Sequence, residues 1–285
     1  MSMTNEQIAA ARARAPLAFR APLQVRLRRA AIWAGFILLF AWCLYDFGFS
    51  PTRIWDGLGR LGRVLSFMFP PYVWTEWDQF AEVLFGLAET LSMAFLGTLL
   101  GAIIAFPLSF LGAKNINRLN FLRLSTRRGY DVIRAFETLI LALIFIRAFG
   151  LGPLAGVLAI AVSEIGTFAK LFSEAIENTS QKPVDGVKAS GGSRLQQIRY
   201  GVMPQVNPVI LSILLYNFES NVRSSTILGI VGAGGIGFLL SDRISTYQWD
   251  QAWSIIFLII AMVYVIDWMS ALIRQRLIGK TETAR

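Results

Sequence analysis

Residues 90–113 read TLSMAFLGTLLGAIIAFPLSFLGA, a run of 24 residues without a charged side chain. An α-helix needs about 20 predominantly apolar residues to cross the hydrocarbon core of a bilayer. The run therefore predicts a transmembrane helix with room to tilt. Within it, Gly97 and Gly101 form a G-x-x-x-G pattern, which lets a neighbouring helix approach closely, although glycine is also common in membrane helices in general.

The composition of the whole chain supports the same class. The 285 residues are 55% hydrophobic and 16% charged, which is typical of an integral membrane protein. The net charge of +9 does not indicate nucleic-acid binding, because Lys and Arg lie beside apolar runs and not on the basic face of a soluble module. The chain has no histidine and a single cysteine, Cys43, so an intramolecular disulfide, a zinc site and a histidine triad are all excluded.

Other apolar runs predict five more crossings, which gives an all-α polytopic transmembrane helix bundle of about six spans. The first, at residues 31–45, is not a cleaved signal peptide, because bulky residues and not a small-residue cleavage site follow it. Residues 49–80 carry charges together with Trp and Tyr rings, which predicts an interfacial segment outside the membrane. The other crossings are residues 206–218, residues 251–266 and two antiparallel helices between residues 130 and 177, separated by FGLGP at 149–153.

The positions of Lys and Arg predict the orientation. With six crossings, the basic segments 1–30, 113–130, 177–205 and 274–285 all lie on the cytoplasmic side, and so do both termini. A seventh crossing at 224–241, which is also uncharged, would place the basic tail outside. We therefore expect 224–241 to form a helix or re-entrant element buried in protein on the outer side.

One glycine motif in that element matches a dinucleotide-binding pattern, but the surrounding sequence does not fit such a site. Residues 232–237 read GAGGIG and match G-x-G-x-x-G, but no strand–helix unit and no acidic residue at the required distance accompany them. The glycines instead suit a hinge or a tight helix contact. The chain also lacks a P-loop sequence, so any work driven by ATP needs a partner.

A polar island interrupts the apolar pattern at residues 185–204, which read DGVKASGGSRLQQIRYGVMP. Gly191 and Gly192 can end one short helix, and Ser193 with Gln196 forms a capping box that begins another. We expect Pro204 to end this second helix. Its residues Leu195, Ile198 and Val202 then form one apolar stripe. The segment is either a docking surface for another protein or an ordinary solvated loop with interfacial helices.

The same stretch resembles the cytoplasmic loop of permease subunits of bacterial ATP-binding-cassette importers, whose pattern is E-A-A, three residues, Gly, nine residues, I-x-L-P. Set on Gly191, the pattern aligns residues 185–187 with E-A-A and residues 201–204 with I-x-L-P, while Gly186, Val187 and Gly201 depart from it. The wider sequences ASGGSRLQQIRYGVMPQVNP and ESNVRSSTILGIVGAGGIG are similar to the phosphonate importer permeases, a branch that includes phosphite systems. The resemblance covers about residues 80 to 275.

The resemblance implies a type I importer permease fold, a second copy of this chain, two separate ATPase subunits and an extracytoplasmic solute-binding protein in a bacterial inner membrane. ATP and Mg would be bound by the ATPase, and this chain would bind no cofactor and catalyse no reaction. The cargo would be a phosphonate, phosphite, hypophosphite or phosphate. Three regions follow: 1–80 with the first span, a permease core at 81–275 and a tail at 276–285. The implied coupling residues are Asp185, Gly191, Ser193, Arg194, Leu195 and Pro204.

An oxyanion that crosses lipid needs hydrogen-bond donors and positive charge along its path. The residues that offer these donors or a mobile backbone are Arg147, Arg223, Ser224, Ser225, Thr226, Gly232, Gly234 and Gly235. The alternative for Arg223 is an ion pair with Glu219, four residues earlier on one helix. Glu164 lies within an apolar run, so it should face protein or a water-filled path, as a contact between helices or a gate.

Two other classes of function are considered as alternatives. An ion-coupled secondary transporter would use the buried Glu164 as a proton site, and it would show two pseudo-repeats, which the sequence does not display. A membrane enzyme is disfavoured because the sequence offers no metal-ligand cluster and no nucleophile with a base.

Overall fold

The computed structural model describes residues 22–117 and 119–282, and these residues form helices and turns without a strand. The basic residues Arg12, Arg14 and Arg20 of the predicted cytoplasmic N-terminus lie outside the described residues, as does the end of the tail at 283–285. The chain divides into two units, residues 1–65 and residues 66–285. The first unit contains α2 (Leu23–Asp46) and all but the last residue of α3 (Pro51–Ser66).

Among the described residues, five helices are long and apolar enough to cross a membrane: Leu23–Asp46, Trp77–Gly112, Pro153–Glu177, Arg194–Ala233 and Trp249–Arg276. In the second unit they belong to α4 (Trp77–Gly112), α7 (Pro153–Glu177), the stretch that contains α10 (Met203–Leu228), and α12 (Trp249–Glu282). The shorter apolar helix α6 (Thr138–Phe149) lies beside α7, which is consistent with a bundle of about six spans.

The helix predicted to begin at Tyr130 is interrupted. Residues 120–134 form a separate amphipathic helix, α5 (Asn120–Arg134), and α6 begins only at Thr138. Gly166 of α7 allows the close approach of α5, because a side chain there would meet the Tyr130 carbonyl oxygen. Most of α5 lies in the basic segment 113–130, and the charges of that segment hide a helical periodicity that is apparent only where α5 packs against α7.

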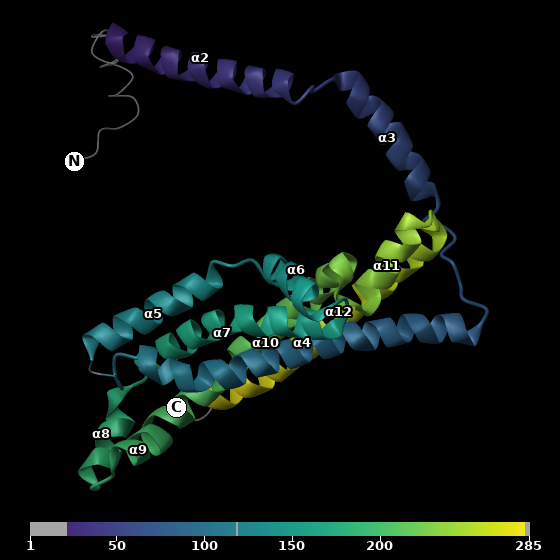
Figure 1. Ribbon diagram of the computed structural model, residues 1–285. Helices are drawn as coiled ribbons and strands as arrows, with labels where there is room; N and C mark the ends of the chain where they lie inside the picture. The colour runs from purple at the N-terminus through teal and green to yellow at the C-terminus, as the bar shows by residue number, and fades with distance from the viewer. Residues whose placement is uncertain (1–21, 118, 283–285) are drawn as a thin grey trace, which may run out of the picture. The chain divides into compact units, whose positions relative to one another are not determined.

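The core contact of the second unit joins α4 and α7. A Cβ atom on Gly97 would lie 2.7 Å from Ile160, and one on Gly101 would lie 2.7 Å from the Glu164 Cβ. The absence of side chains at these two positions lets the helices meet, which confirms that the G-x-x-x-G pattern is a packing motif here. Figure 1 shows α4 and α7 side by side, with α5 running along α7.

Residues 224–241 do not form a separate crossing. The predicted span 206–218 continues as α10 to Leu228, and a π-helical turn, η2 (Gly229–Ala233), follows. The helix is then broken at Gly232 and Gly234, whose φ angles of 109° and 84° favour glycine. The next helix, α11 (Gly235–Ser245), packs against α4 and α12 and runs antiparallel to α4, as α10 does, since the Ile236 N–H bonds Thr90 and Arg243 pairs with Glu82. The segment therefore combines the end of one span with a short helix that continues along α4, so of the two predicted forms, a helix and a re-entrant element, the structure has the helix.

Candidate coupling and translocation sites

The polar island forms a helical hairpin that projects from one end of the second unit (Figure 1). Its first arm is α8 (Gln181–Ala189), and the bend follows at Gly191, whose φ of 81° is in the left-handed region. The Gly191 N–H donates to the Lys188 carbonyl oxygen at 3.0 Å. Ser193 then caps the second arm, because its N–H donates to Gln196 Oε1 at 2.7 Å in a capping box. The bend and the capping box confirm two predictions from the sequence.

The prediction that Pro204 ends the second helix is wrong. The arm continues from α9 (Arg194–Gln196) through a π-helical segment, η1 (Gln197–Val202), into α10, and Pro204 lies in the first turn of α10. The Met203 N–H donates to the Ile198 carbonyl oxygen, five residues back. This wider turn lies just before the proline, and the first turn of a helix tolerates a residue without an N–H.

The π-helical segment also breaks the predicted apolar stripe. Leu195 is 78% exposed, Ile198 is half-buried and Val202 is only 5% exposed. The stripe assumed α-helical spacing, and η1 changes the angle between successive side chains. Leu195 is consequently a large apolar side chain that faces solvent at the tip of the hairpin.

The two arms are fastened to each other near the membrane bundle. A Cβ atom on Gly201 would lie 2.9 Å from the Val184 Cα, so the departure from the family pattern at Gly201 coincides with a close contact between η1 and α8. Gln205 joins the base of the hairpin, since its Nε2 donates to the Ser180 carbonyl oxygen at 3.2 Å and its Oε1 accepts from the Ser180 N–H at 3.0 Å. The hairpin is therefore held as a unit on the end of α10.

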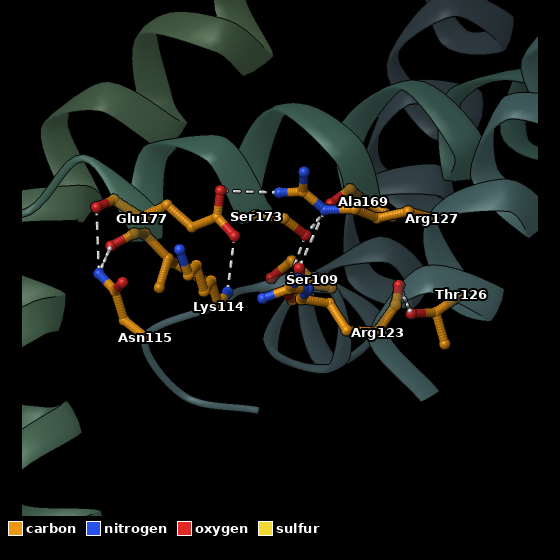
Figure 2. A network of polar contacts seen from close by, with 11 residues as sticks. Ser109, Lys114, Asn115, Arg123, Thr126, Arg127, Ala169, Ser173 and Glu177 are labelled. Carbon is orange, nitrogen blue, oxygen red and sulfur yellow. Dashed lines mark hydrogen bonds and ion pairs between the residues drawn. The ribbon is translucent and has the colours of Figure 1, made fainter. Parts of the chain in front are cut away.

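Glu177, the last residue of α7, belongs to a network of polar contacts four residues before the hairpin begins (Figure 2). Its Oε1 accepts from the Lys114 N–H at 2.6 Å, and its Oε2 pairs with Arg127 Nη2 at 2.8 Å. Arg127 Nε also donates to the Gly112 carbonyl oxygen at 3.1 Å. One carboxylate thus joins the end of α7 to the backbone just after α4 and to the middle of α5, shortly before α8 begins. The sequence analysis did not identify this role, because the partners lie 50 and 63 residues away.

A groove of about 270 Å³ separates α8 from the second arm. Asp185 and Arg194 both line it. Gly191, Ser193 and Leu195 lie exposed at the tip. The structure therefore brings five of the six predicted coupling residues together on the hairpin, and Pro204 lies at its base.

The centre of the bundle contains a small polar cluster. Glu164 is only 7% exposed, and its Oε1 accepts from Asn221 Nδ2 at 2.9 Å. Asn221 Nδ2 also donates to Thr98 Oγ1 at 3.0 Å. Within the described part of the chain, Glu164 Oε2 is buried without a hydrogen-bond partner. The side chain faces protein at the junction of α4, α7 and α10, as the apolar surroundings in the sequence indicated.

Arg223 lies on the opposite side of α10 from that cluster. Its guanidinium pairs with Glu219 Oε1 at 3.3 Å, so the alternative ion pair is present, and with Asp267 Oδ1 of α12 at 3.3 Å. The neighbouring hydroxyls were predicted to offer donors to an oxyanion, but two of them bond to carbonyl oxygens of their own helix. Ser225 is fully buried and donates to the Asn221 carbonyl oxygen at 2.7 Å. Thr226 likewise donates to the Val222 carbonyl oxygen, at 3.4 Å.

The glycine turn is in contact with other elements. The Gly235 N–H donates to Glu89 Oε2 at 2.8 Å, and the Ile236 N–H donates to Thr90 Oγ1 at 2.9 Å, so α4 side chains already occupy the first N–H groups of α11. The Gly152 N–H donates to the Gly232 carbonyl oxygen at 3.1 Å, which ties the α6–α7 turn to η2. Arg147 lies exposed in the last turn of α6. Among the described residues, no group of three or more His, Cys, Asp or Glu side chains is placed to hold a metal ion.

Comparison with known proteins agrees with this architecture. The chain is 38% identical over 238 residues to a putative phosphite transport system permease protein, HtxC, of Stutzerimonas stutzeri, which covers 84% of this chain and 82% of that protein. It is 40% identical over 191 residues to the phosphate-import permease protein PhnE of Mycolicibacterium smegmatis. That match covers 67% of this chain and 36% of PhnE.

The fold is shared with a chain of the MetNI methionine ABC transporter in an inward-facing conformation, with a TM-score of 0.61 and 19% identity. The superposition covers 71% of this chain and 99% of that chain, and it confirms the type I importer permease fold. Residues 97–279 match the family described as binding-protein-dependent transport system inner membrane component. The chain therefore belongs to this family of multi-pass permease subunits of ABC transporters.

Proposed function

We propose that this chain is the permease of an ATP-driven importer for phosphorus oxyanions such as phosphite, phosphonates, hypophosphite or phosphate. The observation that carries the substrate class is the 38% identity to the phosphite permease HtxC over 84% of the chain. Family membership supports the direction of transport, since its members serve binding-protein-dependent systems. The bound cargo reaches this chain from a separate binding protein, so the first selection among oxyanions is made outside it.

The functional assembly contains two copies of this chain, two ATPase subunits that bind ATP and Mg, and an extracytoplasmic binding protein. Both termini and the hairpin at residues 181–202 lie in the cytoplasm, where the ATPase is found. This orientation is supported by the distribution of Lys and Arg along the sequence. The described residues hold no metal cluster of their own, and the chemistry of ATP belongs to the partner.

The hairpin transmits movement from the ATPase to the membrane helices. Leu195 supplies an exposed apolar contact at the tip, while Asp185 and Arg194 supply charged contacts in the groove. Helix α10 continues from the second arm without a break, and Glu177 joins the first arm to α4 and α5 through the end of α7. A displacement of the hairpin therefore acts on several membrane helices together, which is the requirement for alternating access.

No observation favours the secondary transporter. Glu164 is shielded from solvent within one subunit, and its bond to Asn221 serves helix contact. The remaining predicted path residues, Arg147, Ser224 and Gly232, stay candidates for the wall of the path or for its gate.

The test is uptake by the complete transporter in proteoliposomes. The chain is reconstituted with its ATPase and its binding protein, and uptake of radiolabelled phosphite, methylphosphonate and phosphate is measured with ATP inside. We expect saturable uptake of at least one oxyanion that requires both partners. An ATPase variant unable to hydrolyse ATP is the control. Uptake that continues with this variant and follows an ion gradient would instead establish the secondary transporter.

A further inference from the structure

Four charged side chains form a cluster on the face shared by α10 and α12. Arg223 bridges Glu219 and Asp267, and Arg274 Nη2 lies 3.3 Å from Glu219 Oε2. The two carboxylates and two guanidinium groups balance in charge. The cluster contains the predicted Arg223–Glu219 pair and adds two residues of α12, Asp267 and Arg274.

Glu219 and Arg223 of this cluster lie at the depth of Asn221 in the helix bundle, and Arg274 approaches Glu219 from near the end of α12 that leads to the basic tail. Asn221, between Glu219 and Arg223, contacts Thr98 and Glu164. Thr98 belongs to the uncharged run 90–113, and Glu164 lies near the centre of α7. Glu219 and Arg223, each two residues from Asn221 on α10, therefore share this depth, and Asp267 reaches it through its ion pair with Arg223.

These side chains cannot face lipid. The side chains of Arg223 and Asp267 are 46% and 40% exposed in the single chain. Charged groups at mid-bilayer depth almost always face the interior of a bundle or a water-filled cavity, because exposure to hydrocarbon costs several kcal/mol. The α10–α12 face is therefore turned toward water or toward the second copy of the chain.

The pairing within the cluster is loose. All four contacts measure 3.3 to 3.5 Å, whereas the ion pairs of Arg127 with Glu177 and of Lys170 with Asp131 measure 2.8 and 2.7 Å. Charge-assisted bonds between guanidinium and carboxylate are strongest at about 2.7–2.9 Å. The long contacts leave donors of both arginines available to an incoming acceptor.

The contacts of Glu219 indicate which kind of hydrogen-bond acceptor can lie between Arg223 and Arg274. Each of its two carboxylate oxygens faces a different guanidinium group, one from Arg223 and one from Arg274. An anion with several oxygens around one central atom can contact both arginines in the same way. Such an anion would exchange with the carboxylate without leaving the arginines unpaired.

We infer that Arg223 and Arg274 form a transient binding site for the transported phosphorus oxyanion, with Glu219 and Asp267 as the counter-ions that it displaces. This inference rests on the proposed function and deepens it. In the empty transporter the carboxylates neutralise the arginines, and during transport the cargo takes their place. Release follows because the carboxylates remain close enough to pair again, so the cargo is not trapped.

The first test removes the pair while keeping the cluster neutral. The double variant Arg223→Gln/Asp267→Asn is reconstituted with the ATPase and the binding protein, and phosphite uptake is compared with ATP hydrolysis stimulated by the binding protein. The matched control is Lys170→Gln/Asp131→Asn, which removes the pair between α7 and α5. We expect the first variant to lose uptake about tenfold or more while it retains stimulated hydrolysis, because a charge-assisted bond contributes about 1.5–3 kcal/mol. We expect the control to retain uptake. Full uptake by the first variant would overturn the site.

The second test does not depend on the arginine variants folding. In a Cys43→Ser background, Ser224→Cys on the proposed path and Ile103→Cys on the exposed surface of α4 are treated with a water-soluble, charged methanethiosulfonate. We expect the Ser224→Cys thiol to react, and to react several-fold more slowly during phosphite transport, while the Ile103→Cys thiol stays unmodified. Absence of reaction at position 224, or a rate that phosphite does not change, would overturn the proposal. If the unaltered transporter fails to take up any oxyanion while position 224 remains open to water, the proposed substrate class is wrong instead.

Discussion

Asn221 Nδ2 lies 2.9 Å from Glu164 Oε1, and this bond joins α10 to α7 at the centre of the bundle. Because the other carboxylate oxygen of Glu164 has no partner in the described part of the chain, Asn221 is its one hydrogen-bond donor there. The same amide also reaches Thr98 on α4. One side chain therefore fixes the relative positions of three membrane helices.

We expect Asn221→Ala to lower the thermal stability of the purified chain. The substitution leaves a buried carboxyl without a donor, which costs about 1–3 kcal/mol. The control is Asn217→Ala one turn earlier, because Asn217 Nδ2 donates only to the Ile213 carbonyl oxygen of its own helix. Unfolding followed by light scattering or dye binding in detergent measures both. An equal loss of thermal stability in the two variants would show that the Asn221–Glu164 hydrogen bond does not stabilise the bundle more than a bond within one helix.

Two glycines of the hairpin should respond differently to the same change. Gly201→Ala places a Cβ atom 2.9 Å from the Val184 Cα, whereas Gly186→Ala meets no heavy atom within 4 Å. We expect Gly201→Ala to reduce ATP hydrolysis stimulated by the binding protein, since the arms of the hairpin must separate. Gly186→Ala restores the alanine of the family pattern and should keep or slightly raise activity, because alanine favours a helix. If Gly201→Ala stimulates as well as the unaltered chain, the fit between α8 and η1 is not needed for coupling.

Much of this architecture was predictable because its causes are local. The apolar runs around Thr90–Ala113 and Pro153–Glu177, the bend at Gly191 and the Ser193 cap depend on residues close in sequence. Contacts between distant segments were not predictable in this way. Three such contacts join residues 50 to 146 positions apart: the Gly235 N–H with Glu89, Arg127 with Glu177, and Arg274 with Glu219. The failed prediction at Pro204 has another cause, because the π-helical turn before it has no signal in the sequence pattern.

Gly191→Pro should uncouple the transporter without preventing its assembly. Gly191 has a φ of 81°, and proline is held near −65°, so the bend cannot form in its present shape. We expect phosphite uptake to be abolished, while expression and the elution volume of the detergent-solubilised chain remain unchanged. Gly191→Ala tests the same angle more mildly, and it should keep partial uptake because no atom lies within 4 Å of the added Cβ. Uptake at the unaltered rate by Gly191→Pro would exclude the hairpin as the coupling element.

Variants of Glu177 test how a displacement of the hairpin is transmitted to the membrane helices. Glu177→Gln weakens the contact with Arg127 but keeps a side chain of the same size, and Arg127→Ala removes the partner from the other side. Both side chains are about one quarter to one third exposed, so solvent screening limits the loss of stability to about 1 kcal/mol. The effect on coupling should be larger, because this pair links α5 and α7 beside the first arm. We expect both variants to hydrolyse ATP with weaker stimulation by the binding protein and to take up less phosphite per ATP.

The control is Arg128→Ala, whose side chain is 75% exposed and pairs only loosely with Asp131 at 3.5 Å. An equal loss of uptake per ATP in Arg128→Ala would assign the effect to the general charge of this surface and not to Glu177.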